Sequence, residues 1–419
     1  MIYINDLPDN LSCTTYIYAD DTSIYSSVDP AHPDNSTTLL QNDLNEVSTW
    51  ADTWGLQFKA SKSFDLTFTK TGERNYGSLF LGNNQIPTTK THKHLGFVLD
   101  NNLTFNEHVD CLAKKVQKLI NPLRPLSFRL KSCHLNTIYS SFIMPHYDYC
   151  AILYDSASKR ALDHLERIHY NAALMVSGCI HGSSKKKVLN SLNWQTLSSR
   201  RKERQSVYMF KVSKGYVPVY ITQMFVAYSD APVRNLRHHR PYRVPAATSS
   251  KFRNSPTIKM VTLWNNTPVN RRNLPTLSRF KSKTCFNRSR MHSITTMMLK
   301  NLNRKEELCL NRLRVDLLLK GHLFAHNFVN ITDPRCIYCN RNVTTTHFLL
   351  QCQKPDHRVL INDLLNSLVT LQVWDSFGAM TLKDKCHFLL YGDDSLNLKT
   401  NSDIIENTAR FICQTYQDL

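Results

Sequence analysis

Two adjacent aspartates, placed between two strand-like runs, constrain the N-terminal part of this chain more than any other feature. Asp20 and Asp21 follow a β-branched and aromatic run over residues 14–18, and a similar run follows over residues 22–25. This pattern predicts a strand, a tight turn and a second strand, with both carboxylates at the hairpin tip. Neighbouring carboxylates repel each other unless positive charge lies beside them, and a pair of divalent cations is a natural partner. A solvated Asp-Asp turn is the alternative that this short motif leaves open.

Further motifs follow the hairpin in order. A polar, helix-like stretch over residues 36–52 leads towards Lys62, an alternating strand is predicted over residues 64–69, and Leu95-Gly96 follows. In this order the segments resemble the late palm of non-LTR (LINE-type) retrotransposon reverse transcriptases, and the resemblance implies a hairpin at Leu95-Gly96.

The resemblance implies roles for three residues. Asp20 and Asp21 fall on the catalytic carboxylates of the family's third palm motif, which hold Mg²⁺ in a complete polymerase. Lys62 falls on the lysine of the fourth motif, near the leaving pyrophosphate, although Lys59 stands where the family usually has asparagine. The implied partners are an RNA template and target DNA.

The position of the hairpin gives an expectation about activity. Only nineteen residues precede Asp20, whereas the family's fingers and first palm aspartate lie further upstream. The chain is therefore expected to be the C-terminal half of an RNA-directed DNA polymerase and to be inactive alone. A nucleic-acid-binding remnant and a non-functional relic of such an element are the alternatives.

Positive charge is concentrated in the middle of the chain. The formal net charge is +19, from 52 Lys and Arg against 33 Asp and Glu. Residues 181–295 hold 23 of the basic residues and two of the acidic ones, a balance of +21, which leaves −2 for the rest. Such a field attracts polyphosphate and predicts nucleic-acid contact, with a nuclear-localisation signal as the alternative. The candidate contact residues are Lys185, Lys186, Lys187, Arg200, Arg201, Lys202 and Arg204.

A second metal motif lies near the C-terminus. Cys336, Cys339, His347 and Cys352 form the pattern C-x2-C-x7-H-x4-C. Two thiolates from one turn and a His–Cys pair can complete a tetrahedral, structural Zn²⁺ site, with His357 as second choice for the fourth ligand. The segment also resembles the C-terminal zinc-knuckle region of LINE-type proteins.

Alternatively, the cysteines of this motif are buried free thiols or form a disulfide. No signal peptide or transmembrane run is visible in the sequence. We therefore expect a reducing, intracellular location, in the nucleus or cytoplasm, where disulfides are disfavoured and no membrane is involved. The oligomeric state is not predicted.

These patterns predict an α+β fold: a partial polymerase palm from the metal hairpin onward, a mostly helical thumb and C-terminal region, and a small zinc knuckle. The expected divisions are a palm at 1–110, a helical thumb and connection at 111–225, a basic linker region at 226–295, and a C-terminal helical region at 296–419 with the knuckle at 335–358.

Helices are expected over residues 107–120, 132–145, 159–176 and 198–214. Residues 227–260 are rich in Pro, Ser, Arg and His and predict a long loop. Trp194, Trp264 and Phe280 are expected to be core anchors rather than base-stacking platforms, because large aromatic residues usually fill cores.

Overall fold

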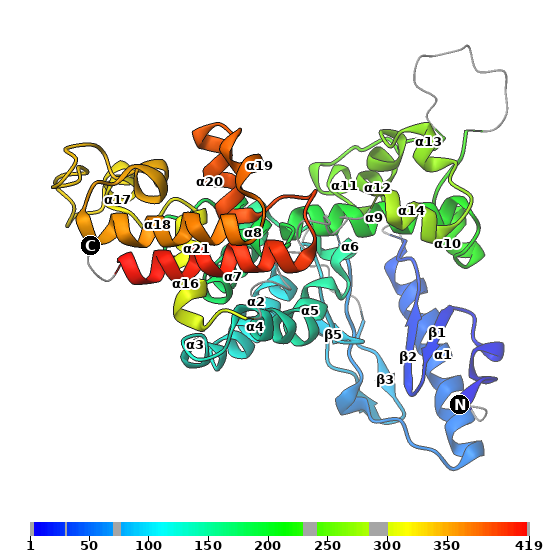
Figure 1. The fold of residues 1–419 in the computed structure, drawn as a ribbon. Coiled ribbons are helices and arrows are strands. Elements are labelled where there is room, and N and C mark those ends of the chain that lie inside the picture. The colour runs from blue at the N-terminus through cyan, green and yellow to red at the C-terminus, as the bar shows by residue number, and fades with distance from the viewer. Residues whose placement is uncertain (1–3, 30–31, 70–76, 229–240, 285–300, 417–419) are drawn as a thin grey trace. The chain divides into compact units, whose positions relative to one another are not determined.

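The computed structural model describes residues 4–29, 32–69, 77–228, 241–284 and 301–416. The chain divides into two compact units, Met1–His108 and Val109–Leu419 (Figure 1). Across the described residues the fold is mostly helical, and its strands form three separate two-stranded sheets. The predicted helical character is therefore confirmed, whereas a continuous palm sheet is not seen in these ranges.

In the first unit, a hairpin packs on one long helix. Strands β1 (Thr14–Tyr18) and β2 (Asp21–Tyr25) pair antiparallel, and α1 (Pro33–Trp54) follows them. Ile17 and Ile24 pack against a small core that includes Val47 of α1. Alternation along the strands thus directs Ile17 and Ile24 inward and leaves the tyrosines outside.

A buried carboxylate fixes the start of the hairpin. Asp43 of α1 is 2% exposed and accepts hydrogen bonds from the backbone N–H groups of Ser12 at 2.9 Å and Cys13 at 2.7 Å. These residues directly precede β1, so the helix determines where the hairpin begins.

The remaining strands of the first unit are short: β3 (Phe80–Leu81), β4 (Asn84–Gln85), β5 (Thr91–His94) and β6 (Phe97–Asp100). The β5–β6 hairpin predicted around Leu95-Gly96 is confirmed. Both turn residues have positive φ, 48° and 80°, which suits a two-residue hairpin turn. The strand predicted over residues 64–69 is wrong, since only a single bridge joins Asp65 to Thr88 there.

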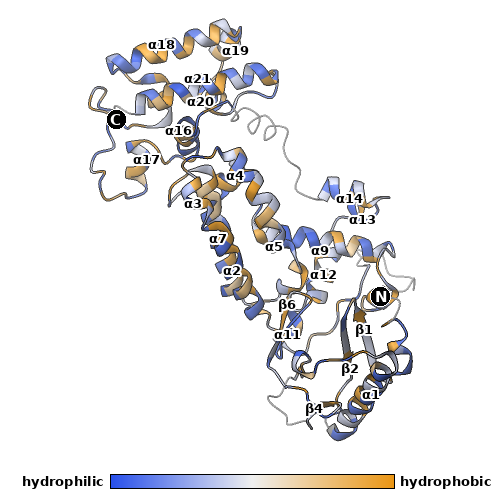
Figure 2. Ribbon diagram, turned by 90° about the horizontal axis from the view of Figure 1, so that it is seen from below, coloured by the Kyte–Doolittle hydropathy of each residue, from blue (hydrophilic) through white to orange (hydrophobic). Residues whose placement is uncertain are grey.

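The middle of the chain is helical, and its helices are α2 (Asn106–Ile120), α3 (Leu123–Leu126), α4 (Ser132–Ile138), a π-helical turn (Tyr139–Ile143), α5 (Met144–Asp148), α6 (Ala151–Tyr154), α7 (Lys159–Ser177), α8 (Lys185–Ser191), α9 (Leu197–Ser213) and α10 (Val219–Gln223). The four predicted helices are confirmed, although the second is divided by the π-helical turn. Both hydrophilic and hydrophobic residues occur along α7 and α9 (Figure 2), as expected for helices that bury one side.

Part of the predicted loop is helical. Helices α11 (Ser250–Arg253), α12 (Pro256–Asn265), α13 (Val269–Arg272) and α14 (Leu277–Thr284) follow in sequence, so the loop prediction for 227–260 is wrong from Ser250 onward. α12 and α14 pack on α9. Trp264 is 2% exposed and Phe280 is fully buried, and Phe280 stacks on Phe210 with ring centroids 4.5 Å apart. Both predicted core anchors are confirmed, as is Trp194, at 5% exposure.

A second core lies in the C-terminal part, formed by α16 (Arg304–Arg314), α18 (Pro355–Thr370), α20 (Leu382–Tyr391) and α21 (Leu398–Tyr416). Helices α18 and α21 run side by side (Figure 1). Shorter elements complete this part: α17 (Lys320–Ala325), a π-helical turn (His347–Gln351) and α19 (Trp374–Gly378). None of the helices in the described ranges combines the length and the apolar character that a membrane crossing requires.

Candidate metal centres and basic surface

The structure confirms the hairpin and the position of its aspartates. Tyr18 pairs with Asp21, so Ala19 and Asp20 form a two-residue turn. Ala19 has φ 57°, in the left-handed region that non-glycine residues seldom adopt. Asp20 and Asp21 are both exposed at the tip.

One face of the hairpin carries tyrosines beside an aspartate. Residues directly opposite each other in an antiparallel pair share a face, so Asp21 lies on the same face as Tyr18 and, two residues along, Tyr16. Tyr16 and Tyr25 stack with ring centroids 5.6 Å apart, and Tyr18 is 68% exposed. The face that bears Asp21 is therefore open to a ligand.

The two aspartates do not belong to a larger ligand cluster. Within the described ranges, the one group of three or more His, Cys, Asp or Glu side chains that could hold a metal lies elsewhere, in the C-terminal part. Lys62 ends a short 3-10 turn (Ala60–Lys62) and is exposed. Its predicted role beside the aspartates stays a prediction.

The C-terminal cluster contains the four residues that the sequence motif singled out. One ligand atom from each of Cys336, Cys339, His347 and Cys352 lies within 4.8 Å of all the others. Cys336 Sγ and Cys352 Sγ are 4.0 Å apart, close to the roughly 3.8 Å that two thiolates bound to one tetrahedral Zn²⁺ at about 2.3 Å would have.

Backbone hydrogen bonds shape the turn that holds the first two cysteines. The N–H of Cys336 donates to the carbonyl oxygen of Arg341 at 2.8 Å, and the N–H of Asn340 donates to the carbonyl oxygen of Cys336 at 2.9 Å. Asn340 has φ 50°, a conformation that asparagine tolerates well. The N–H of Gln353 donates to Cys339 Sγ at 3.0 Å.

The environment of His347 fits a metal ligand. His347 is 3% exposed, and both ring nitrogens are buried without a hydrogen-bond partner. Buried polar atoms normally have partners, so a neutral imidazole in this position fits metal coordination. Burial lowers the pKa of His347, which keeps the ring neutral. Burial also raises the pKa of Cys352 to about 11.

His357 is not part of this cluster. Its Nε2 lies 2.6 Å from the carbonyl oxygen of Phe348, to which it donates, and the ring packs edge-on against Phe348 and Phe411. The role of His357 as rival fourth ligand is therefore wrong, because that nitrogen is already engaged in the core.

The knuckle is built into the C-terminal core rather than standing apart. Val343, Phe348 and Leu349 belong to the same buried cluster as residues of α18 and α21. By contrast, Ile337 and Tyr338 at the tip are 87% and 60% exposed. The tip of the knuckle is therefore exposed, whereas its base is buried in the C-terminal core.

Some of the predicted basic residues form ion pairs within the chain, whereas others are exposed outside such pairs. Arg200 and Arg204 both bind Asp148, Arg200 through two bonds of 2.9 and 2.6 Å, and Arg201 Nε donates to Asp155 at 2.6 Å. Lys185 pairs with Glu166 at 3.0 Å, and Lys187 pairs with Asp316. Lys186 and Lys202 are exposed, and no ion pair joins either to an acidic residue in the described ranges.

The acidic partners were missed from the sequence. Asp148 and Asp155 lie 52 and 46 residues before their arginine partners. Arginine–carboxylate pairs of this kind are strong and geometrically specific. No local sequence signal marks them, because the contact depends on how α5 and α6 pack on α9.

Comparison of the sequence with known proteins shows which proteins this chain is similar to. The chain is 28% identical over 169 residues to the RNA-directed DNA polymerase from mobile element jockey of Drosophila melanogaster, covering 38% of this chain and 18% of that protein. It is 27% identical over 143 residues to the probable RNA-directed DNA polymerase from transposon X-element of the same fly, covering 33% and 16%. About a third of this chain is similar to the RNA-directed DNA polymerases of non-LTR retrotransposons.

A third relative shows the same extent of similarity. The jockey polymerase of Drosophila funebris is 25% identical over 146 residues, covering 34% of this chain and 16% of that protein. The matched part thus spans less than a fifth of the length of each of these curated relatives. No protein-family model and no solved structure matches the chain.

Proposed function

We propose that the chain is the C-terminal part, from the metal hairpin onward, of the RNA-directed DNA polymerase of a non-LTR retrotransposon. The observation that carries the proposal is the exposed Asp20-Asp21 pair at the tip of β1–β2, in a chain related to such polymerases. In the complete enzyme, Asp20 and Asp21 would hold Mg²⁺, which would supply charge stabilisation for phosphoryl transfer. Lys62 donates a proton to the leaving pyrophosphate or stabilises its charge.

The C-terminal cluster is proposed as a structural Zn²⁺ site. The support is the gathering of four ligand atoms within 4.8 Å and the two unpartnered nitrogens of buried His347. Cys336, Cys339, His347 and Cys352 would hold the ion as four protein ligands, and it would serve to stabilise the fold.

The proposed partners are an RNA template and target DNA. The printed names of the relatives support this, since RNA-directed DNA synthesis requires an RNA template. Phosphate contact is assigned to Lys186 and Lys202, which are exposed outside internal ion pairs. Arg200, Arg201 and Arg204 contribute mainly by holding α9 against α5 and α6, and the exposed edges of Arg200 and Arg204 add to the basic surface.

A chimera tests the polymerase proposal. The fingers and early palm of a jockey polymerase, up to the start of its own metal hairpin, are fused to this chain, and primer extension on an RNA template is measured with Mg²⁺. Extension that Asp20→Ala abolishes, and that Asp9→Ala at an exposed position of this chain before the hairpin leaves intact, supports the assignment. Extension that survives Asp20→Ala would refute it.

A further inference from the structure

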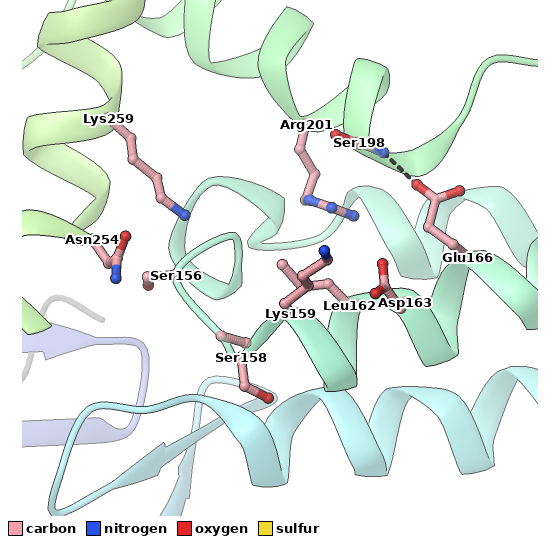
Figure 3. A pocket seen from close by; sticks show the side chains of 11 residues that line it. Ser156, Ser158, Lys159, Leu162, Asp163, Glu166, Ser198, Arg201, Asn254 and Lys259 are labelled. Carbon is pink, nitrogen blue, oxygen red and sulfur yellow. Dashed lines mark hydrogen bonds between the residues drawn. The ribbon is translucent and has the colours of Figure 1, made fainter. Parts of the chain in front are cut away.

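A polar pocket in the second unit has no role in the function proposed so far. It has a volume of about 420 Å³, within the range of small-ligand sites. The N-terminal part of α7, the first turns of α9 and residues Asn254 and Lys259 line it (Figure 3). Three cations, Lys159, Arg201 and Lys259, face it from three different segments.

Arg201 supplies the observation that points to a ligand. The residue is 4% exposed, and its Nε donates to Asp155 Oδ1 at 2.6 Å. Its Nη1, however, is buried without any hydrogen-bond partner. Leaving a donor of a charged group unsatisfied is costly, and the guanidinium is directed towards the pocket in Figure 3. The pocket therefore offers a charged donor that lacks its acceptor.

The charges around the pocket leave a positive excess. Glu166 is already satisfied, by Lys185 at 3.0 Å and by the N–H of Ser198 at 2.7 Å. Asp155 is shared between Arg201 and Lys259, so one carboxylate serves two cations. Lys159 adds a further positive charge and Asp163 opposes it.

Lys259 also has an ammonium proton available for a ligand. Its ammonium group donates to the backbone oxygen of Asp155 at 2.6 Å and to Oδ2 of the same residue at 3.4 Å. An ammonium has three protons, so one remains for a ligand. Together with Arg201 Nη1 and the flexible amine of Lys159, the pocket presents convergent donors for a tetrahedral oxyanion.

We propose that this pocket binds the terminal phosphate group of a nucleic-acid strand. The choice of phosphate among oxyanions, and of a strand as its source, rests on the proposed nucleic-acid function. A terminal phosphate fits better than one within a strand, because Arg201 Nη1 lies beneath the pocket surface and a small group must enter to reach it. A phosphate within a strand carries a sugar on each side, whereas a terminal one presents three free oxygens.

The test compares two single-stranded DNA oligonucleotides that differ only in a 5′-phosphate or 5′-hydroxyl group, each labelled at the 3′ end. Fluorescence anisotropy with the full chain should show tighter binding of the phosphorylated strand by about 10-fold, as expected for charge-assisted hydrogen bonds. Lys159→Ala should abolish most of this preference. Arg160→Ala, which changes the adjacent exposed residue outside the pocket lining, should retain it.

A second measurement separates this inference from the proposed function. Inorganic phosphate should raise the thermal unfolding temperature of the chain and of Arg160→Ala, but not of Lys159→Ala. Equal binding of the two oligonucleotides, with no protection by phosphate, would mean that the pocket holds only water and would overturn the inference. Protection by phosphate without oligonucleotide binding would overturn the strand terminus as the source and identify a free phosphate site. Binding of both strands without preference, together with protection by phosphate, would likewise overturn the strand terminus as the source and leave the nucleic-acid function intact.

Discussion

Gly178 and Gly215 share a backbone conformation but differ in their surroundings. Comparing the two positions therefore isolates the effect of adding a Cβ atom next to a neighbouring side chain. Gly178 ends α7 with φ +73°, and Gly215 lies beyond α9 with φ +67°. A Cβ built at Gly178 would lie 1.7 Å from Leu308 Cδ2, whereas one at Gly215 meets nothing within 4 Å. The close approach of α16 to the end of α7 thus depends on the missing side chain.

We expect Gly215→Ala to lower the free energy of unfolding by about 1 kcal/mol, the penalty for a left-handed alanine. Gly178→Ala should lower it by about 2–4 kcal/mol, because a packing clash adds to the same penalty. Chemical denaturation of the two variants measures the difference. Equal losses would show that Leu308 moves away without cost.

A buried histidine makes stability depend on pH. His169 is fully buried, its Nδ1 lies 2.8 Å from the Tyr139 hydroxyl and its Nε2 lies 2.9 Å from the carbonyl of Gln195. Burial is the main cause that lowers the pKa of His169 to about 4. The neighbouring Glu166 acts against this shift, and Lys185 and Arg200 reinforce it.

The sign of the effect follows from proton binding. An unfolded histidine has a pKa near 6.5, so between about pH 4 and 6.5 the unfolded chain binds the additional proton. Stability should therefore be full above about pH 6.5 and fall as the pH drops towards 4, by up to about 3 kcal/mol. His169→Gln should flatten this part of the pH profile in denaturation experiments, whereas His134→Gln, at an exposed position, should not. An unchanged slope in His169→Gln would contradict the assignment.

At the scale of elements, the sequence predicts the hairpins and helices whose formation depends on neighbouring residues. The first hairpin could be predicted because strand-forming runs flank its turn, and the four helices because apolar residues recur along them. The second hairpin was implied by the family resemblance. The segment from Ser250 to Thr284 was missed because its helices are short and its composition is polar. Side-chain caps at Ser249 and Ser255 mark the helix starts, but only packing of α12 and α14 on α9 makes such short helices stable.

The candidate zinc site could be predicted from spacing, yet its surroundings could not. The four ligands are close in sequence, so the spacing alone brings them together. The core beneath them includes Leu310, Ile361 and Phe411, which come from three distant helices. A backbone contact completes it: a Cβ at Gly321 would lie 2.5 Å from the carbonyl oxygen of Val343.

We expect one Zn²⁺ per chain and a local response to its removal. Structural zinc contributes on the order of 10–16 kcal/mol in finger peptides, but here α16, α18 and α21 support the base of the knuckle. Chelation should therefore increase hydrogen exchange across residues 335–352 while α21 stays protected. Cys339→Ser should reproduce this effect at saturating zinc, and Cys413→Ser, at a half-buried cysteine outside the cluster, should not. Protein purified under reducing conditions without zinc would exclude the site.

At the scale of the whole molecule, formal charge overstates the surface available to a polyanion. The excess in residues 181–295 is visible in the sequence, but the ion pairs that consume part of it are not. Arg201 and Lys202 illustrate the difference. They are adjacent in sequence, yet Arg201 is buried against Asp155 and Lys202 is exposed.

The two residues should therefore respond in opposite ways to alanine substitution. Lys202→Ala should weaken binding to single-stranded nucleic acid uniformly across sequences and reduce the log–log salt slope by about 0.7. It should leave the free energy of unfolding unchanged. Arg201→Ala should lower that free energy by about 3–5 kcal/mol, because Asp155 loses a buried partner. Salt titrations and denaturation measure the two effects, and a binding loss confined to Arg201→Ala would reverse the assignment.

The activity of the whole polypeptide depends on how many carboxylates meet at the hairpin. Two-metal phosphoryl transfer requires ligands that bridge the ions, and Asp20 and Asp21 gather no third His, Cys, Asp or Glu ligand in the described ranges. We therefore expect the 419-residue polypeptide, assayed by itself, to extend no primer on an RNA template with Mg²⁺ or Mn²⁺. The control is binding of the same primer–template at low salt, which should persist because it depends on the basic surface and not on the metal. Primer extension by the purified polypeptide that Asp20→Ala abolishes would show that the hairpin recruits its remaining ligand from within these residues.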